Sequence, residues 1–141
     1  MTDPTDPTDL TDLTATMRQL MPFTDTLGVS VERYAADEVR ARVAWDERLC
    51  TSGGVLHGGV LMALADSTGA ACAFLNLPAG ATGTTTVESK TNFLRAVRDG
   101  YVEAISRPLH TGRTLIVVET DLRDDRARLV ARVTQSQLVL T

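Results

Sequence analysis

The sequence predicts an α+β domain in which an antiparallel sheet of five or six strands wraps around one long central helix. Two observations predict it. Residues 60–75 form an apolar run of helical length, and several other runs alternate apolar and polar residues between turn residues. The chain has 141 residues, the size of one domain, and 43% of them are hydrophobic, so it can build a core.

The N-terminal segment differs in composition from the rest of the chain. Residues 1–9 repeat a Thr-Asp-Pro unit and lack apolar content, which is typical of a disordered acidic tail. We therefore predict a single folded domain over residues 10–141. The apolar residues from Leu10 to Met21 follow helical spacing, and Pro22 is expected to end this short helix.

The strands are predicted from alternation. In residues 38–45, Val39, Ala41, Val43 and Trp45 share one face and the polar residues share the other, so we expect one face of this strand to be exposed to solvent. After the long helix, four more runs have strand character and are separated by turn signals of the Asp-Gly, Thr-Gly and Asp-Asp type. These runs cover residues 84–94, 101–107, 114–123 and 129–140.

Charge and cysteine content limit the expected partners and compartment. The formal net charge is −4, and four acids in the first twelve residues match it, so no nucleic acid is expected as a partner. The N-terminus is acidic where a signal peptide would be basic, and no stretch is uniform and long enough for a membrane span. Cys50 and Cys72 form no C-x-x-C motif and are expected to be reduced thiols in a cytoplasmic protein.

Asp66 is the only formally charged residue between Arg48 and Glu88, and it interrupts the apolar run. A carboxylate in such a segment is usually paired, protonated or catalytic. Upstream, His57 and two glycines open the predicted helix and leave backbone N–H groups approachable by an anion. The two features predict an acyl-transfer site with oxyanion donors and a carboxylate base or nucleophile. The alternative for Asp66 is a structural carboxylate that is buried against an arginine or hydrogen-bonded to a helix end. The alternative for His57 is a residue that only caps the helix or fixes the loop.

The run Leu56-His57-Gly58-Gly59 with Asp66, followed by the strand that ends in Asn92-Phe93-Leu94-Arg95, resembles the hotdog-fold acyl-CoA thioesterases of the PaaI type. The resemblance extends over nearly the whole chain after the tail. It implies the hydrolysis of acyl-CoA to a free acid and CoA, with no further cofactor and no metal. It also implies a homodimer at least, often a dimer of dimers, with the active site at the dimer interface.

The resemblance assigns roles to individual residues. Gly58 would donate its backbone N–H to the thioester carbonyl, and Asp66 would act as base or nucleophile. The hydroxyl of Thr86 would orient the water or the acid, and His57 would shape the turn. If Gly58 and Asp66 belong to one helix, they lie about 12 Å apart along its axis. We therefore expect the two groups of one site to come from two protomers.

The remaining candidates concern substrate binding. Many relatives have Asn or Gln in the loop before the histidine, whereas this chain offers only hydroxyls there. The acyl pocket is predicted between the helix and the facing strand, with Leu61 and Leu64 among its lining residues. Arginines at strand ends and turns are candidates for the CoA phosphates. The candidate substrate-binding residues are Gly59, Thr51, Ser52, Phe93, Arg95, Arg98 and Arg113.

Two rival functions follow from the same fold. A hotdog dehydratase or hydratase would act on 3-hydroxyacyl or enoyl thioesters, but those enzymes typically have proline next to the histidine, where this chain has two glycines. A non-catalytic acyl-CoA-binding sensor would be expected to lack the helix acid and to carry a DNA-binding module. The sequence has Asp66, and its N-terminal segment is too short and acidic for such a module.

Overall fold

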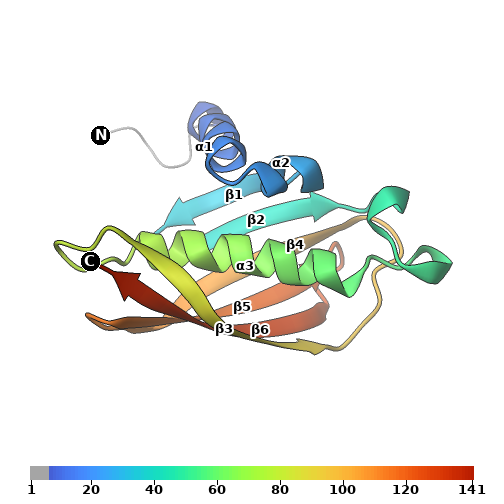
Figure 1. The fold of residues 1–141 in the computed structure, drawn as a ribbon. Helices are drawn as coiled ribbons and strands as arrows, with labels where there is room; N and C mark the ends of the chain where they lie inside the picture. The colour runs from blue at the N-terminus through green and yellow to red at the C-terminus, as the bar shows by residue number, and fades with distance from the viewer. Residues whose placement is uncertain (1–6) are drawn as a thin grey trace.

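The computed structural model describes residues 7–141 and shows a six-stranded antiparallel sheet curved around the long helix α3, Gly58–Phe74 (Figure 1). The strand order is β1-β2-β4-β5-β6-β3. The predicted α+β hotdog arrangement is confirmed. The other elements are α1 (Pro7–Leu20), α2 (Pro22–Leu27), β1 (Ser30–Ala35), β2 (Glu38–Ala44), β3 (Gly83–Phe93), β4 (Tyr101–Thr111), β5 (Leu115–Asp124) and β6 (Leu129–Leu140), with short 3-10 helices at Glu47–Leu49 and Ser52–Gly54.

The helix α3 forms the core together with the inner face of the sheet. Leu64, Ala65 and Cys72 on the helix are fully buried, as are Val39 and Val43 on the predicted inner face of β2. Since burial of aliphatic side chains is the main favourable term in folding, this contact holds the sheet in its curved form.

One narrow stripe of α3 is left uncovered by the sheet. It consists of every fourth residue, Gly58, Met62, Asp66, Ala70 and Phe74, which are exposed or half-buried. Residues four apart lie on one face of a helix. Met62 and Phe74 are 39% and 55% exposed. Asp66 therefore lies in the middle of an apolar stripe on the surface of the single chain.

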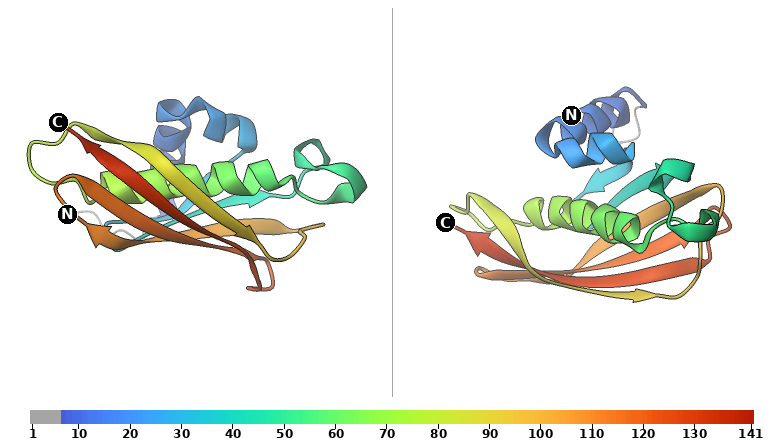
Figure 2. Two further views of the ribbon diagram at one scale, coloured as in Figure 1. Left: turned by 60° about the horizontal axis from the view of Figure 1, so that its bottom comes forward. Right: turned by 45° about the vertical axis from the view of Figure 1, so that its right-hand side comes forward.

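The two edges of the sheet differ. Helix α1 covers the β1 edge, where the Val31 N–H donates to Thr14 Oγ1 at 2.8 Å and Arg18 Nε donates to the Val29 carbonyl at 2.8 Å. Figure 2 shows α1 and α2 beside β1. At the other edge, β3 pairs only with β6 in the described chain, and its Val87 and Phe93 are 58% and 52% exposed. The sheet thus has one protected edge and one open edge.

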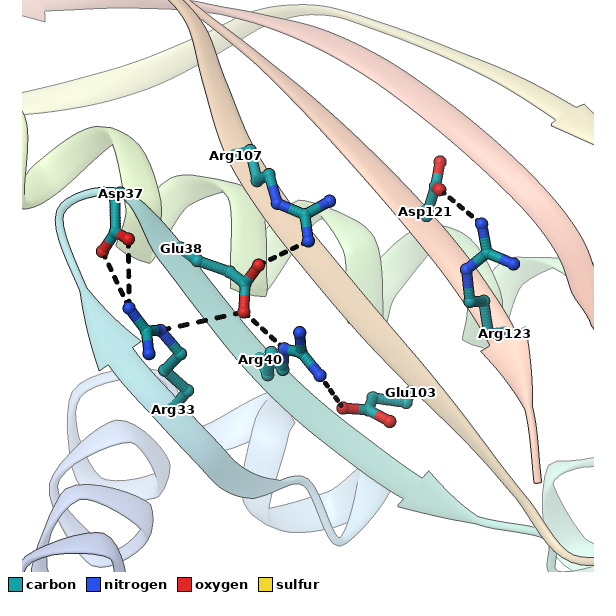
Figure 3. A network of polar contacts seen from close by, with 8 residues as sticks. All are labelled: Arg33, Asp37, Glu38, Arg40, Glu103, Arg107, Asp121 and Arg123. Carbon is teal, nitrogen blue, oxygen red and sulfur yellow. Dashed lines mark hydrogen bonds and ion pairs between the residues drawn. The ribbon is translucent and has the colours of Figure 1, made fainter. Parts of the chain in front are cut away.

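The outer face of the sheet carries a network of ion pairs over β1, β2 and β4. Glu38 binds Arg40 and Arg107, and Arg40 also binds Glu103, so the charges on β2 and β4 neutralise one another (Figure 3). Arg33 on β1 joins this network through Glu38. The solvent-exposed face predicted for residues 38–45 is the face of the strand that points away from α3.

The element boundaries differ from the prediction in the N-terminal part. Helix α1 begins at Pro7, so residues 7–9 of the predicted tail have helical backbone, while residues 1–6 lie outside the described residues. Pro22 follows the end of α1 as expected but also opens α2, because proline fits the first position of a helix. Strand β1 was missed because its alternation is irregular, and a register shift between Val31 and Arg33 accompanies that irregularity.

Strand β4 is longer than the predicted run 101–107 and continues through Pro108 to Thr111. Proline lacks an N–H and normally interrupts a central strand. Here β2 pairs with β4 only as far as Ser106, so Pro108 needs a partner on one side only, and the register shifts between Pro108 and His110. The unpaired side explains why the strand tolerates proline.

The turn between β5 and β6 depends on Asp124, which is buried. Burial disfavours its charged form, but hydrogen bonds from Arg128 and Arg126 outweigh this and lower the pKa of the carboxyl. Its Oδ1 accepts the N–H groups of Arg126 and Arg128, and its Oδ2 accepts from Arg128 Nε at 2.8 Å. The carboxylate therefore holds the turn from inside.

We expect Asp124→Asn to lower the free energy of unfolding at pH 7 by about 1–2 kcal/mol. The NH2 group of the asparagine would face one of the N–H donors that Asp124 now accepts, so that hydrogen bond would be lost. Because the folded-state pKa is depressed, this stabilisation is present above the unfolded value of about 3.9 and is lost as the pH falls through the folded value. Urea denaturation of both proteins at pH 7 and pH 3 checks it. Equal stability at pH 7 would contradict the role of Asp124.

Candidate active site

Asp66 accepts hydrogen bonds on one of its two carboxylate oxygens. Thr86 Oγ1 donates to Asp66 Oδ1 at 3.0 Å, and Gln135 Nε2 approaches the same oxygen at 3.4 Å. Within residues 7–141, Asp66 forms no ion pair and its Oδ2 receives no hydrogen bond. The alternative of a structural carboxylate bound to an arginine is therefore not supported, and one oxygen remains available to a substrate or a water.

Thr86 reaches Asp66 because of strand pairing. In the β3–β6 ladder Thr86 lies opposite Gln137, and the register shifts between Thr86 and Glu88, so Val87 is an extra residue beside the site. Such a bulge re-aims neighbouring side chains. Gln137 Nε2 donates to Thr86 Oγ1 at 2.6 Å. The hydroxyl thus accepts from Gln137 and donates to Asp66.

The start of α3 is capped by His57, whose Nδ1 accepts from the Gly59 N–H at 2.8 Å. A Cβ on Gly59 would lie 2.9 Å from this nitrogen, so glycine permits the cap. The structure therefore gives His57 the capping role. Gly59 was predicted to bind substrate, and its N–H is already bonded to His57. Gly58 is the first residue of the helix, where an N–H has no partner within the helix. It is the candidate oxyanion donor, reinforced by the positive end of the helix dipole.

Gly58 and Asp66 lie on the same exposed stripe of α3, two turns apart. Their separation along the axis is about 12 Å. One carbonyl carbon cannot contact both groups of the same chain. Phe93, predicted to bind substrate, lies over the helix start, since a Cβ on Gly58 would approach its ring atoms at 3.2 Å.

The loop before α3 is held in place by hydrogen bonds from two side chains to its backbone carbonyl groups. Trp45 Nε1 donates to the Gly54 carbonyl and Arg98 Nη1 donates to the Gly53 carbonyl, both at 3.0 Å. Thr51 and Ser52, the predicted hydroxyl donors, are exposed on this loop. The structure places them at the Gly58 end of the helix, not beside Asp66 of the same chain.

The three candidate arginines do not gather in one chain. Arg95 and Arg98 follow β3, and this segment lies at the start of α3 because the Leu56 N–H bonds to the Val97 carbonyl. Arg113 lies in the β4–β5 turn at the opposite end of the sheet, next to the end of β6. All three side chains are exposed, and Arg98 also fixes the loop through Gly53.

A cavity of about 330 Å³ opens one turn beyond Asp66, between α1, the end of α3 and the start of β3. Apart from Thr16, Gly83 and Thr84, its lining is hydrophobic, and it includes Met17, Ala70 and Phe74. The predicted lining residues Leu61 and Leu64 do not reach it, since they are 4% and 0% exposed and pack into the core. This cavity thus lies further along the helix than Leu61 and Leu64, and α1 forms one wall.

The sequence reasoning missed Gln135 and Gln137, which are fully buried on the inner face of β6. Their signal was two polar residues in the alternating positions between Val133 and Val139, where apolar residues are expected. Gly69 of α3, which faces Gln135, was also missed. A Cβ there would lie 2.3 Å from Gln135 Oε1, so the helix accepts a glycine, at about 0.5–1 kcal/mol, to admit this amide.

Other reaction types find less support in the described chain. Cys72 is buried, and burial raises the pKa of its thiol to about 11, so it is not a nucleophile at neutral pH. Within residues 7–141 no three His, Cys, Asp or Glu side chains are placed to hold a metal ion. None of the helices in that range has the length and apolarity of a membrane span.

A hotdog fold with an N–H at the helix start and a carboxylate on the open helix stripe has groups that an acyl-transfer hydrolase can use. The chain belongs to the Thioesterase superfamily, whose family model matches residues 53–131, and it is a thioester hydrolase. The finer PaaI-type assignment stays a prediction.

Individual relatives agree with this membership. A Haemophilus influenzae protein whose name proposes an esterase is 35% identical over 116 residues, 81% of this chain and 83% of that protein. The 1,4-dihydroxy-2-naphthoyl-CoA hydrolase of Escherichia coli is 30% identical over 103 residues, 73% of this chain and 75% of the hydrolase. A crystal structure of a mutant thioesterase from Pseudomonas aeruginosa superposes with a TM-score of 0.84 at 29% identity, covering 93% of both chains.

Proposed function

We propose that the chain hydrolyses acyl-CoA thioesters to a carboxylic acid and free CoA, with Asp66 as base or nucleophile and the Gly58 N–H as oxyanion donor. The observation that carries the proposal is the arrangement of Asp66. Two donors hold its Oδ1, its Oδ2 is unbonded in the described chain, and it shares an open helix stripe with Gly58. Neither a metal nor a cofactor is required.

The chemistry has two stages. The carbonyl oxygen accepts the Gly58 N–H, and this bond strengthens as negative charge develops, which is typically worth about 3–4 kcal/mol of barrier. Asp66 then either deprotonates a water that attacks the carbonyl carbon or attacks it directly to give an anhydride, which water hydrolyses. In both routes the C–S bond breaks and the CoA thiolate takes up a proton. Both routes use the same unbonded oxygen.

A second copy of this chain completes the proposed site. An antiparallel partner helix laid along the open stripe brings its Gly58 over Asp66, which one chain cannot do across about 12 Å. The open edge of β3 supports this partner, because it leaves a row of backbone groups unpaired beside the exposed Val87 and Phe93. A two-fold axis at this edge gives two equivalent sites per dimer. We extend the proposal to a dimer of dimers on the family resemblance alone.

The proposed dimer also gathers the substrate-binding residues. Antiparallel β3 strands bring Arg95 and Arg98 of one protomer to the end of the sheet where its partner has Arg113, so cations from both copies are available to the CoA phosphates. The same antiparallel arrangement brings Thr51 and Ser52 of one protomer towards the partner's Asp66. The apolar cavity one turn beyond Asp66 is an argument for a substrate with an uncharged acyl group. The reduced cysteines support a cytoplasmic location.

Release of free thiol from a panel of aromatic, short-chain and medium-chain acyl-CoAs, followed with a thiol reagent, tests the proposal. We expect thiol release at a rate well above the uncatalysed one for at least one member with an apolar acyl group. Hydration of an enoyl-CoA without thiol release would indicate the dehydratase alternative. Saturable acyl-CoA binding with neither reaction would indicate a sensor, and both outcomes would overturn the proposal.

The shared site predicts complementation between two inactive variants. In a mixed dimer of Asp66→Asn and Gly58→Pro chains, one site has both defects and the other has neither. Mixed dimers isolated with two affinity tags should therefore recover about half of the wild-type turnover. Each variant refolded alone is the control. If mixed dimers stay as inactive as the controls, each site is built within one protomer.

A further inference from the structure

Two buried glutamine side chains connect the inner face of β6 to the carboxylate of Asp66. Gln135 and Gln137 are both 0% exposed, on the face of the strand that packs against α3. In each, the amide oxygen Oε1 is buried without a hydrogen-bond partner in the described chain. Burying polar groups in this way opposes folding. Packing alone would favour leucine at both positions, so the amides need another explanation.

The nitrogens of the same amides have partners, and both lead to Asp66. Gln137 Nε2 donates to Thr86 Oγ1 at 2.6 Å, and Thr86 donates to Asp66 Oδ1 at 3.0 Å. A hydroxyl has one proton, so a second acceptor beside it would compete with Asp66, whereas a second donor leaves the proton to Asp66. The amide of Gln137 supplies that donor. It therefore sets the direction of the Thr86 hydrogen bond.

Gln135 acts on the carboxylate directly. Its Nε2 lies 3.4 Å from Asp66 Oδ1 and 3.5 Å from the Asp66 carbonyl oxygen. The amide passes beside Gly69, where any larger residue would collide with it, so helix and strand are both shaped around this contact. Both contacts are made to Oδ1, and Oδ2 receives no hydrogen bond within the described residues.

We propose that Gln137 and Gln135 are positioning residues that fix the rotation of the Asp66 carboxylate, Gln137 through Thr86 and Gln135 directly, so that Oδ2 faces the thioester. This inference rests on the proposed function of Asp66. The two buried amides on β6 are then part of the site, although neither glutamine contacts substrate. Stability is lost in exchange for orientation.

The test uses Gln137→Leu, which has nearly the same size and no donor. We expect kcat to fall about tenfold, the effect of losing one ordinary hydrogen bond in the transition state, with KM unchanged. The melting temperature should stay the same or rise, because an unsatisfied buried carbonyl is removed. A merely structural glutamine would instead lower the melting temperature. Gln135→Leu should behave in the same way.

A double-mutant cycle separates action through Thr86 from other effects. In a Thr86→Val background, Gln137→Leu should change kcat less than twofold, because the hydroxyl it orients is gone. Equal tenfold losses in both backgrounds would overturn the route through Thr86. Thr120→Val is the matched control, since it removes the buried 2.7 Å hydroxyl pair with Ser106 on β4 and β5, which does not reach Asp66.

A crystal structure of Gln137→Leu gives a readout that does not depend on turnover. We expect the Thr86 side chain to rotate or its contact with Asp66 Oδ1 to lengthen. An unchanged contact would overturn the inference, even if the wild-type protein released no thiol from any acyl-CoA. A wild-type protein that is inactive would contradict the proposed function instead. An active wild type with an equally active, cooler-melting Gln137→Leu variant would contradict only the inference.

Discussion

Asp66→Asn is expected to lower kcat for acyl-CoA hydrolysis by about a hundredfold to ten-thousandfold while the fold is retained, because an amide can serve neither as base nor as nucleophile. The amide oxygen can still accept from Thr86 and Gln135 in the position of Oδ1. The substitution therefore changes only the group at the unbonded Oδ2. Thiol release under saturating substrate and thermal unfolding of both proteins measure the two effects.

The matched control for this substitution is Asp37→Asn, which removes a surface carboxylate in the β1–β2 turn whose side chain is 75% exposed. It should leave kcat unchanged. A kcat for Asp66→Asn within about tenfold of the wild type would contradict the catalytic assignment of Asp66, since general base or nucleophilic catalysis raises the rate by more than tenfold.

Gly58→Pro is expected to remove most of the turnover, because it removes the oxyanion donor without disturbing the helix. Gly58 is the first residue of α3, where proline is well tolerated. The preceding His57 has φ −61° and ψ 135°, the extended conformation that a following proline requires. Loss of one oxyanion donor typically costs about a hundredfold to a thousandfold in kcat. Thiol release and the dimer mass of the variant are the measurements.

Gly58→Ala is the matched control, because it adds the same Cβ and keeps the N–H. That Cβ would approach the Phe93 ring at 3.2 Å, so a modest loss shared by both variants reports crowding by Phe93. The difference between the proline and alanine variants reports the N–H. Equal kcat values for two folded dimers would show that the oxyanion donor lies elsewhere.

The fold could be predicted because its signals are local in the sequence. The apolar run around Asp66 and the alternation in residues 38–45 reflect which side of each element faces the core, and both are visible within a few residues. Strand β1 and the extension of β4 past Pro108 could not be predicted in this way. Their pairing depends on neighbours that are distant in the sequence, and in both cases a register shift breaks the alternation.

The site was predictable where a residue type conflicts with its surroundings. A lone carboxylate in an apolar helix and two glycines after a histidine are such conflicts, and they identified Asp66 and Gly58 as the candidates. The two glutamines of β6 conflict with an apolar strand face in the same way. They were missed because a polar residue in a strand suggests a wet face unless its burial is known.

The sequence by itself determined the class of fold, the family, and the pair of groups proposed to carry the reaction, because these depend on residue type and short spacing. Only the tertiary structure decided that Asp66 lies on an open stripe, that Thr86 and two buried glutamines converge on one of its oxygens, and that β3 is the free edge. These facts arise from the β3–β6 pairing and the packing of α3 over it, which join segments about 50 to 70 residues apart. Local periodicity contains no information on such contacts, because they are set by how separate elements pack.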